Sequence, residues 1–388
     1  MNFHFWQTSP NEHESGWIRG LTNMGHSVRV YICGDMPQSR MSLGLGQVDY
    51  GVAEIIRPSL VHMEECLQSC STAEDLHFFT GIKEFQLNRM AYSLLSRSQA
   101  RLFYISESKD IRGFKGVMRL LRDIVLDYYR RRRIDAVLAM GELGTKWFRR
   151  IGFDSSRIFE FCYAVADSSS HNRDIAPDHD PGRDANSFKV AYVGQLIKRK
   201  NVDSLLMALA SINNEGLSFT LEIIGSGEEE VHLRQNASSL GIASVVNFLG
   251  AMKNDELRAH MRESDLLVLP SAWDGWGAVT NEALLAGCRV GVSLMCGSSV
   301  LAKNMPKCFT FPSGDVHTLA SELRKQIAYG RVTQEERATK CVLARSMIGE
   351  VAIAKYLLHI VDFVIAPANN RPVQPWELPT TQFNHRKL

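Results

Sequence analysis

The chain has 388 residues, of which 45% are hydrophobic, and its 44 Lys and Arg nearly balance 42 Asp and Glu to give a net charge of +2. This length favours two domains over one. The balanced charge, together with the absence of any recognisable binding module, argues against a nucleic-acid-binding protein. Eight scattered cysteines form no C-x-x-C pair, which predicts reduced thiols in a cytoplasmic protein.

Two segments bear on membrane association. The N-terminal MNFHFWQTSP has neither a basic nor an apolar signal-peptide region, so we expect no signal peptide. The most apolar late stretch, YLLHIVDFVIA at 356–366, is too short to span a bilayer and contains His359 and Asp362. We therefore expect a core helix there, and a protein that is cytoplasmic or at most peripheral to the inner face of the membrane.

The first half of the chain alternates apolar runs with amphipathic segments. Strands are predicted at 2–7, 27–33, 77–82, 101–106 and 134–140, and helices at 15–24, 83–97, 112–132 and 143–151. The polar stretch that follows, rich in Asp, Ser and Pro, has the composition of a linker.

The second half shows the clearest rhythm. Short Val-, Ile- and Leu-rich runs start near 189, 220, 245, 266 and 289, and about ten helical residues follow most of them. This pattern is typical of βαβ units with a parallel, doubly wound sheet. A long helical stretch at 333–366 then predicts a terminal helix that packs back on the first domain.

The predicted fold is therefore α/β, with two Rossmann-like domains facing each other across a cleft. The expected bounds are 1–167 for the acceptor-side domain, 168–187 for the linker, 188–350 for the donor domain and 351–388 for the returning helix and tail. In such sheets ligands bind beyond the carboxyl ends of the strands. Motifs at strand ends are thus the candidate site residues.

The first such motif is LLVLPSAWDGWGAVTNEALLAG at 266–287, with two acids, Asp274 and Glu282. Gly275 and Gly277 let the backbone approach a ligand, and the helix start that follows favours a phosphate. A carboxylate so close would repel phosphate, so both acids are better suited to accept hydrogen bonds from sugar hydroxyls. Alternatively, Asp274 is a turn residue and Glu282 an acid that favours a helix start.

A second and a third motif follow other strands. Gly194 ends a strand and precedes Lys198, Arg199 and Lys200, which are either a solvated loop or a phosphate clamp. EIIGSGEEE places Gly225 and Gly227 after another strand, a weak signal alone but one that fits the same cleft. No P-loop motif occurs, so the chain is not a P-loop NTPase.

In this order, G-Q-L-x-x-x-K, strand-G-x-G and P-S-x-x-D-G-W-G-x-x-x-x-E-A-x-x-x-G resemble retaining glycosyltransferases of the GT-B fold, family 4, within the glycosyl transferases group 1. The resemblance covers Phe188 to about Leu301 and reaches the first half only through general architecture. It implies that Glu282 holds the donor ribose, that Asp274 contacts hydroxyls of the transferred sugar and that Lys200 binds phosphate. The further donor-binding positions it implies are Gly194, Gln195, Arg199, Gly225, Gly227, Ser271, Gly275, Gly277 and Ala278.

Two positions depart from the family pattern. Asp274 replaces the usual Glu and has a shorter reach. Gln195 stands where the family usually has an arginine, so the arginine's role is weakened or passes to Arg199 or Lys198. These departures leave open whether activity is reduced or redirected.

The resemblance implies transfer of a hexose from a nucleotide-diphosphate sugar to a hydroxyl of a glycan or lipid-linked acceptor, with retention at the anomeric carbon. The expected setting is synthesis of a cell-surface polysaccharide, lipopolysaccharide or glycolipid. We expect no cofactor and no metal, because the D-x-D element of 178–180 lies in the linker rather than at a strand end. The alternatives are an epimerase or phosphorylase on the same fold, or a catalytically silent nucleotide-binding scaffold.

The acceptor side is predicted from the first domain. His13 and Ser15, with Ser15 capping the following helix, and Glu107 after another strand are candidate acceptor contacts, although each also fits an ordinary polar loop. The basic helix at 112–133 carries an apolar stripe of Val117, Leu121, Ile124, Val125 and Tyr128. Such a stripe usually packs on a sheet, and the alternative is contact with an anionic membrane surface.

Overall fold

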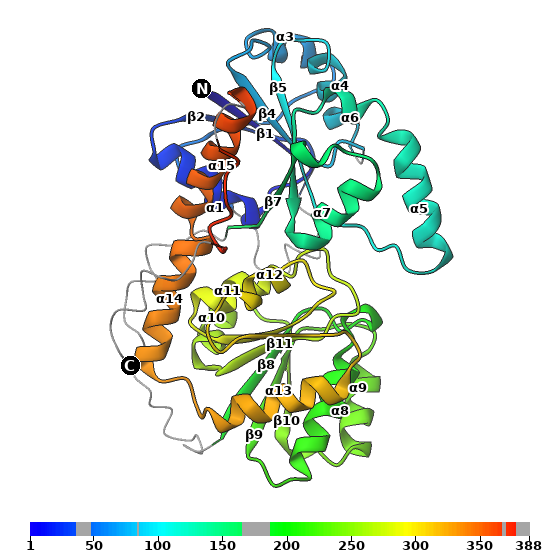
Figure 1. Cartoon of the computed structure of the whole chain (residues 1–388), viewed down its shortest axis with the longest axis vertical. Coiled ribbons are helices and arrows are strands. Elements are labelled where there is room, and N and C mark those ends of the chain that lie inside the picture. The colour runs from blue at the N-terminus through cyan, green and yellow to red at the C-terminus, as the bar shows by residue number, and fades with distance from the viewer. Residues whose placement is uncertain (36–47, 84, 165–186, 367–369, 378–388) are drawn as a thin grey trace.

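The computed structural model describes residues 1–35, 48–83, 85–164, 187–366 and 370–377. These residues form two α/β domains stacked along the long axis of the molecule (Figure 1). Each domain has one sheet whose strand pairs are all parallel. The predicted α/β class with two Rossmann-like domains is confirmed. The predicted linker, apart from Ser187, lies outside the described residues, and so do Asp178–Asp180.

The first domain has a seven-stranded sheet in the order β3-β2-β1-β4-β5-β6-β7. Its strands are β1 (Asn2–Gln7), β2 (Ser27–Ile32), β3 (Glu54–Ile56), β4 (Asp75–Thr80), β5 (Arg101–Ser106), β6 (Ala136–Met140) and β7 (Ile158–Phe161). Its helices are α1 (Glu12–Asn23), α3 (Met63–Gln68), α4 (Gln86–Leu95), α5 (Gly113–Leu126), α6 (Arg130–Arg133) and α7 (Gly141–Arg150).

The second domain has a six-stranded sheet in the order β10-β9-β8-β11-β12-β13. Its strands are β8 (Phe188–Val193), β9 (Phe219–Ile224), β10 (Val246–Gly250), β11 (Leu266–Leu269), β12 (Arg289–Ser293) and β13 (Phe309–Phe311). Its helices are α8 (Val202–Asn213), α9 (Glu230–Ser239), α10 (Asn254–Glu263), α11 (Val279–Leu285), α12 (Ser299–Lys303) and α13 (Val316–Ala328).

Strand composition explains the burial of both sheets. The inner strands β6 and β11 are apolar runs with every residue buried, as expected for parallel strands covered by helices on both faces. Every residue of β12 is buried too, and its Arg289 forms an ion pair with Glu336. The short edge strands β3, β7 and β13 were missed by the sequence prediction. Three or four residues between loops carry too little periodicity to be recognised.

The C-terminal segment ties the two domains together. The helix predicted at 333–366 is in fact two helices, α14 (Gln334–Ile348) and α15 (Glu350–Ile365), which meet at Gly349. As predicted, α15 packs on the first domain, where it lies against α1 (Figure 1). A Cβ on Gly20 of α1 would lie 2.6 Å from the Glu350 carbonyl oxygen, so a glycine allows this close approach.

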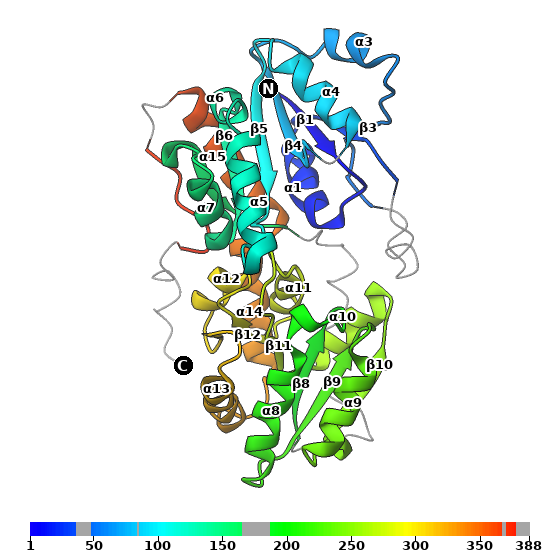
Figure 2. The ribbon, with the colours of Figure 1, turned by 90° about the vertical axis from the view of Figure 1, so that its right-hand side faces the viewer.

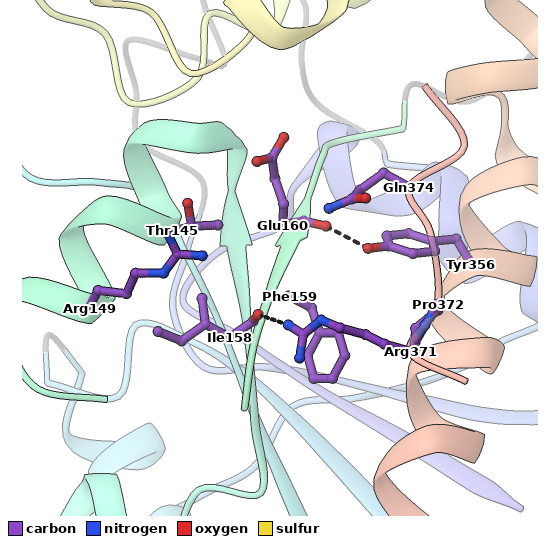
Figure 3. Close-up of a pocket in the computed structure, with 9 residues that line it drawn as sticks. All are labelled: Thr145, Arg149, Ile158, Phe159, Glu160, Tyr356, Arg371, Pro372 and Gln374. Atoms are coloured by element: carbon purple, nitrogen blue, oxygen red, sulfur yellow. Dashed lines mark hydrogen bonds between the residues drawn. The ribbon is translucent and has the colours of Figure 1, made fainter. Parts of the chain in front are cut away.

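The segment after α15 lies along the last strand of the first sheet. Arg371 of this segment donates from Nη1 to the carbonyl of Ser156, just before β7, at 2.9 Å, and Tyr356 of α15 itself donates from Oη to the carbonyl of Glu160 in β7 at 2.9 Å. A small polar cavity of about 130 Å³ lies between this segment and β7 (Figure 3). Burial there raises the pKa of Glu160 to about 7.

Two expectations about the first domain were wrong. The N-cap of α1 is Asn11, whose side chain accepts from the His13 amide, whereas Ser15 is buried one turn further on and donates to the Glu12 carbonyl. The apolar stripe of α5 does not pack on the sheet either, since Ile124 is the one member of the stripe that is partly buried.

Within the described residues, no helix is both long and apolar enough to cross a bilayer.

Candidate functional site

The loop after β8 brings cations to the carboxyl edge of the second sheet. Lys198–Lys200 form one 3-10 turn, and Asn201 then takes a left-handed conformation, with φ of 52°, before α8 begins. The turn is fastened to the neighbouring loop, since the Arg199 carbonyl accepts from the Ala272 amide at 2.9 Å. The Arg199 guanidinium donates to the Trp273 carbonyl at 2.8 Å and lies over the Trp273 ring.

Lys200 and Asp274 form an ion pair between the two loops. Both side chains are largely buried, and Arg199 Nη1 lies 3.9 Å from the second carboxylate oxygen of Asp274. The Asp274 backbone is held by the Met295 carbonyl and the Gly297 amide. The structure therefore brings together two of the predicted residues, which are 74 positions apart, and fixes their backbones.

Glu282 lies on α11 and is partly buried. Loss of hydration raises the pKa of its carboxyl to about 7, and the nearby negative charge of Glu12 adds to this rise, while Arg258 opposes it. Glu12 belongs to the first domain and accepts from Asn254 at 2.9 Å and from Arg258 at 3.3 Å. The surroundings of Glu282 thus include residues of both domains.

Glu107 of the first domain contacts the glycine-rich turn of the second domain. A Cβ built on Gly275 would lie 1.9 Å from Glu107 Oε2, so the carboxylate contacts the Gly275 backbone directly. Burial raises the pKa of Glu107, an effect that its hydrogen bond from Tyr163 Oη, at 3.0 Å, opposes. Of the three candidate acceptor residues, Glu107 is the one placed beside Asp274 and Gly275.

Tyr163 and Trp276 continue this contact between the domains. Trp276 is fully buried and donates to Asn281 at 2.8 Å, and Asn281 in turn donates to the Tyr163 carbonyl at 2.8 Å. The Tyr163 and Trp276 rings meet edge to face. This chain of contacts holds the β11–α11 loop against the first domain.

The two glycines after β9 serve loop packing. A Cβ on Gly225 would lie 1.9 Å from the Gly194 carbonyl oxygen, and one on Gly227 would lie 2.3 Å from that of Leu196. The Leu196 amide donates to the Ser226 carbonyl at 2.9 Å. These glycines therefore set the β8 loop, and with it Lys200, at its position over the sheet.

The other predicted residues are dispersed around this centre. Gln195 and Lys198 are exposed, and the Gln195 carbonyl accepts from Tyr192 Oη at 2.8 Å. Ser271 is fully buried beside Cys296 and does not face solvent. Gly277 has a φ of +85° at the turn before α11, where Ala278 is the N-cap. His13 lies beside the Tyr163 ring.

Sequence reasoning missed four residues that build the site: Tyr163, Asn254, Arg258 and Asn281. Tyr163 follows the short edge strand β7, which the sequence did not reveal. Asn254 and Arg258 lie on α10, and both donate to Glu12 of the other domain. Such contacts depend on how the domains are placed, which no local motif encodes.

Two side-chain clusters of the described residues offer three metal-ligand atoms each, and neither includes Lys200, Asp274 or Glu282. One is His4, Cys70 and His77, buried under the first sheet, and the other is Asp203, Glu229 and His232 near α8 and α9. In the first, all four histidine ring nitrogens already have hydrogen-bond partners. All eight cysteines are free thiols.

Comparison with solved structures identifies the fold. The structure of Anabaena Alr3699/HepE in complex with UDP superposes with a TM-score of 0.66 and covers 93% of this chain and 100% of that chain, at 19% sequence identity. The chain has the GT-B fold. The predicted fold is thus confirmed, including the C-terminal helix that returns to the first domain.

Sequence comparisons place the similarity in the second domain of this GT-B chain. Residues 178–340 match the model of the family "Glycosyl transferases group 1". The 2-deoxystreptamine glucosyltransferase of Streptomyces kanamyceticus is 28% identical over 139 residues, 35% of each chain. A GDP-mannose-dependent alpha-(1-6)-phosphatidylinositol monomannoside mannosyltransferase of Mycobacterium tuberculosis is 32% identical over 113 residues. That match covers 28% of this chain and 29% of the relative, so the chain spans about a third of the length of both relatives.

Proposed function

We propose that this protein transfers a hexose from a nucleotide-diphosphate sugar to a hydroxyl of a glycan or lipid-linked acceptor, with retention at the anomeric carbon. The observation that carries the proposal is the Lys200–Asp274 ion pair at the edge of the second sheet, which lies beside Glu107 of the first domain, with Glu282 on the helix that follows. The match to glycosyl transferases group 1 covers all three residues of the second domain. UDP bound to HepE and the glycosyl-transfer names of both relatives support a nucleotide-sugar donor.

In the proposed reaction the bond between the anomeric carbon and the β-phosphate oxygen breaks, and its electron pair leaves with the diphosphate. Lys200 and Arg199 stabilise the growing negative charge, the task that a metal performs in other transferases. The ammonium of Lys200 has three protons, so it can keep its contact with Asp274 while donating to a phosphate oxygen. The acceptor oxygen forms the new bond on the same face of the sugar, and its proton passes to the leaving diphosphate oxygen.

The two acids of the second domain bind neutral hydroxyls in this proposal. Glu282 accepts from the ribose hydroxyls, and Asp274, held by Lys200 and by its backbone, accepts from hydroxyls of the transferred sugar. Glu107 contributes the acceptor-side wall of the same space. A lipid-linked acceptor would place the protein at the inner face of the membrane during synthesis of a polysaccharide or glycolipid, a setting that fits the phosphatidylinositol-mannoside name of one relative.

Proton NMR of the purified protein with α-linked nucleotide sugars tests the reaction and its stereochemistry together. Incubation with UDP-glucose, GDP-mannose, ADP-glucose and dTDP-glucose in turn should release nucleotide from one of them, and the first free or transferred sugar signal should be that of the α-anomer. A β-anomer as first product would refute retention. Intact donors in every case would favour the silent scaffold, and a converted sugar still attached to its nucleotide would favour an epimerase.

A further inference from the structure

Helix α5 presents hydrophobic side chains to solvent along its whole length. Of the 23 large hydrophobic side chains that are exposed among the described residues, eight lie between residues 114 and 129. Phe114 is 80% exposed, Val125 is 70% exposed, and Val117, Met118 and Leu121 are about half exposed. These five residues recur at helical spacing and so share one side of the helix. We refer to them as the outer face of α5.

The opposite side of α5 buries two charged side chains. Asp123 and Asp127 are 1% and 2% exposed. Lys83 lies 3.3 Å from Asp123 and 2.7 Å from Asp127, and Lys109 lies 3.0 Å from Asp123. The helix is therefore anchored to the first domain by buried ion pairs together with the partly buried Leu120 and Ile124. Its orientation is fixed with the apolar face outward, the reverse of an ordinary surface helix.

Positive charge borders the outer face. Between 112 and 133 the chain has eight basic residues and two acidic ones, and the two acids are the buried Asp123 and Asp127. Lys115 and Arg122 are exposed beside the outer face, where Arg122 also contacts the buried Asp123 at 3.0 Å, and the basic turn α6 continues beyond the end of the helix. A solvent-facing surface that combines apolar side chains with basic residues and lacks exposed acids is complementary to an anionic lipid bilayer.

The place of α5 in the molecule leaves this surface open. In Figure 1 the helix lies at the outer edge of the first domain, and in Figure 2, turned by 90°, it stands in front of β5 and β6. Its N-terminal end follows Glu107 by only six residues. The outer face therefore begins close in sequence to Glu107.

We infer that the outer face of α5, with Lys115 and Arg122, is a docking surface for an anionic lipid bilayer. Hydrophobic side chains enter the headgroup region while the basic residues contact lipid phosphates, and the buried ion pairs keep the helix in this orientation. A second copy of the chain fits the surface less well, because pairing two such faces would bring like charges together. The inference does not depend on the sugar-transfer proposal, since lipid binding needs no donor.

Vesicle flotation of the full chain tests this surface. Vesicles of phosphatidylcholine alone are compared with vesicles containing about one-third phosphatidylglycerol, at low and high salt. The wild-type protein should float with the anionic vesicles only, and less at high salt. The variant Leu121→Ser/Val125→Ser and the variant Lys115→Gln/Arg122→Gln should each bind roughly tenfold more weakly.

Matched controls are available elsewhere on the molecule. Met207 and Val231 are exposed to a similar degree on the second domain, and Lys146 and Lys325 are exposed lysines away from α5. The variants Met207→Ser/Val231→Ser and Lys146→Gln/Lys325→Gln should float like the wild type. Unchanged melting temperatures of the α5 variants would show that they fold.

Three outcomes would overturn the inference. These are equal partitioning of the wild type to both vesicle types, full binding by the folded α5 variants, and absence of binding altogether. If sedimentation instead showed a dimer that the Leu121→Ser/Val125→Ser variant abolished, the surface would be assigned to self-association rather than to lipid.

Discussion

Replacing Lys200 by alanine is the sharpest test of the site chemistry. Among the described residues, Lys200 is one of two cations within 4 Å of Asp274, and in the proposed reaction it contacts the departing diphosphate. A charge-assisted hydrogen bond contributes about 1.5–3 kcal/mol, and each 1.36 kcal/mol corresponds to a factor of ten in rate. We therefore expect Lys200→Ala to lower kcat roughly 10- to 150-fold. The effect should fall on kcat more than on KM, because the charge develops in the transition state.

The neighbouring Lys198 provides a matched control. It carries the same charge in the same turn but is exposed, whereas Lys200 is largely buried and forms an ion pair with Asp274. Release of nucleotide from the donor that the protein accepts should be measured for both variants, with melting temperature as a check of folding. Wild-type turnover in folded Lys200→Ala would refute the assignment. An equal loss in Lys198→Ala would assign the effect to the general charge of the loop.

Lys200→Ala should also lower the free energy of unfolding, and this effect should be measured separately from turnover. Lys200→Ala leaves Asp274 with only the more distant Arg199, so unfolding should become easier by about 1–2 kcal/mol. The double variant Lys200→Ala/Asp274→Asn removes the unpaired charge and should regain most of that stability without regaining activity. Recovery of activity in the double variant would show that Lys200 acts only by pairing with Asp274.

Three further predictions concern the same cleft. Because the pKa of Glu282 is raised in the folded protein, folding favours its protonated form, so the free energy of unfolding falls as pH rises from about 4.5 to about 7 and no longer changes with this group at higher pH. The free energy of unfolding in urea should be measured at pH 5 and pH 8, and Glu282→Gln should reduce its decrease between these values by up to about 2 kcal/mol. An unchanged decrease would contradict the burial of the Glu282 carboxyl. Gly275→Ala should lower turnover at least about tenfold, because the added Cβ would collide with Glu107. The double variant Gly275→Ala/Glu107→Ala should restore part of the domain contact and so raise the melting temperature above that of Gly275→Ala. Activity in EDTA should stay within about twofold of the untreated value, and a loss reversed by Mg²⁺ or Mn²⁺ would contradict metal-independent transfer.

The second domain could be predicted well from sequence because its signals are local. The apolar run before Pro270 and the glycines at 275 and 277 indicate a strand, a tight turn and a helix start within a dozen residues. Asp274, Glu282 and Lys200 all follow parallel strands, so the topology alone brings them to one edge. The structure agrees with that expectation, and it adds the Lys200–Asp274 ion pair.

The first domain and the cleft were less predictable because their determinants are not local. Contact of Glu107 with Gly275 depends on the placement of one domain against the other, and Tyr163 follows a four-residue edge strand. The apolar stripe of helix α5 faces solvent, whereas such a stripe usually faces the core. Its orientation is set by Lys83 and Lys109, which reach Asp123 from outside the helix.

Ligand-dependent thermal stability tests the central claim, a nucleotide-sugar site at the edge of the second sheet, most directly. Wild type, Glu282→Gln and Lys200→Ala should be melted with UDP, GDP, ADP and dTDP sugars at a fixed excess, since a ligand that binds the folded state raises the melting temperature. One nucleotide sugar should raise the melting temperature of the wild type, and both variants should show a markedly smaller rise. No rise with any donor, or an equal rise in the wild type and both variants, would contradict the account.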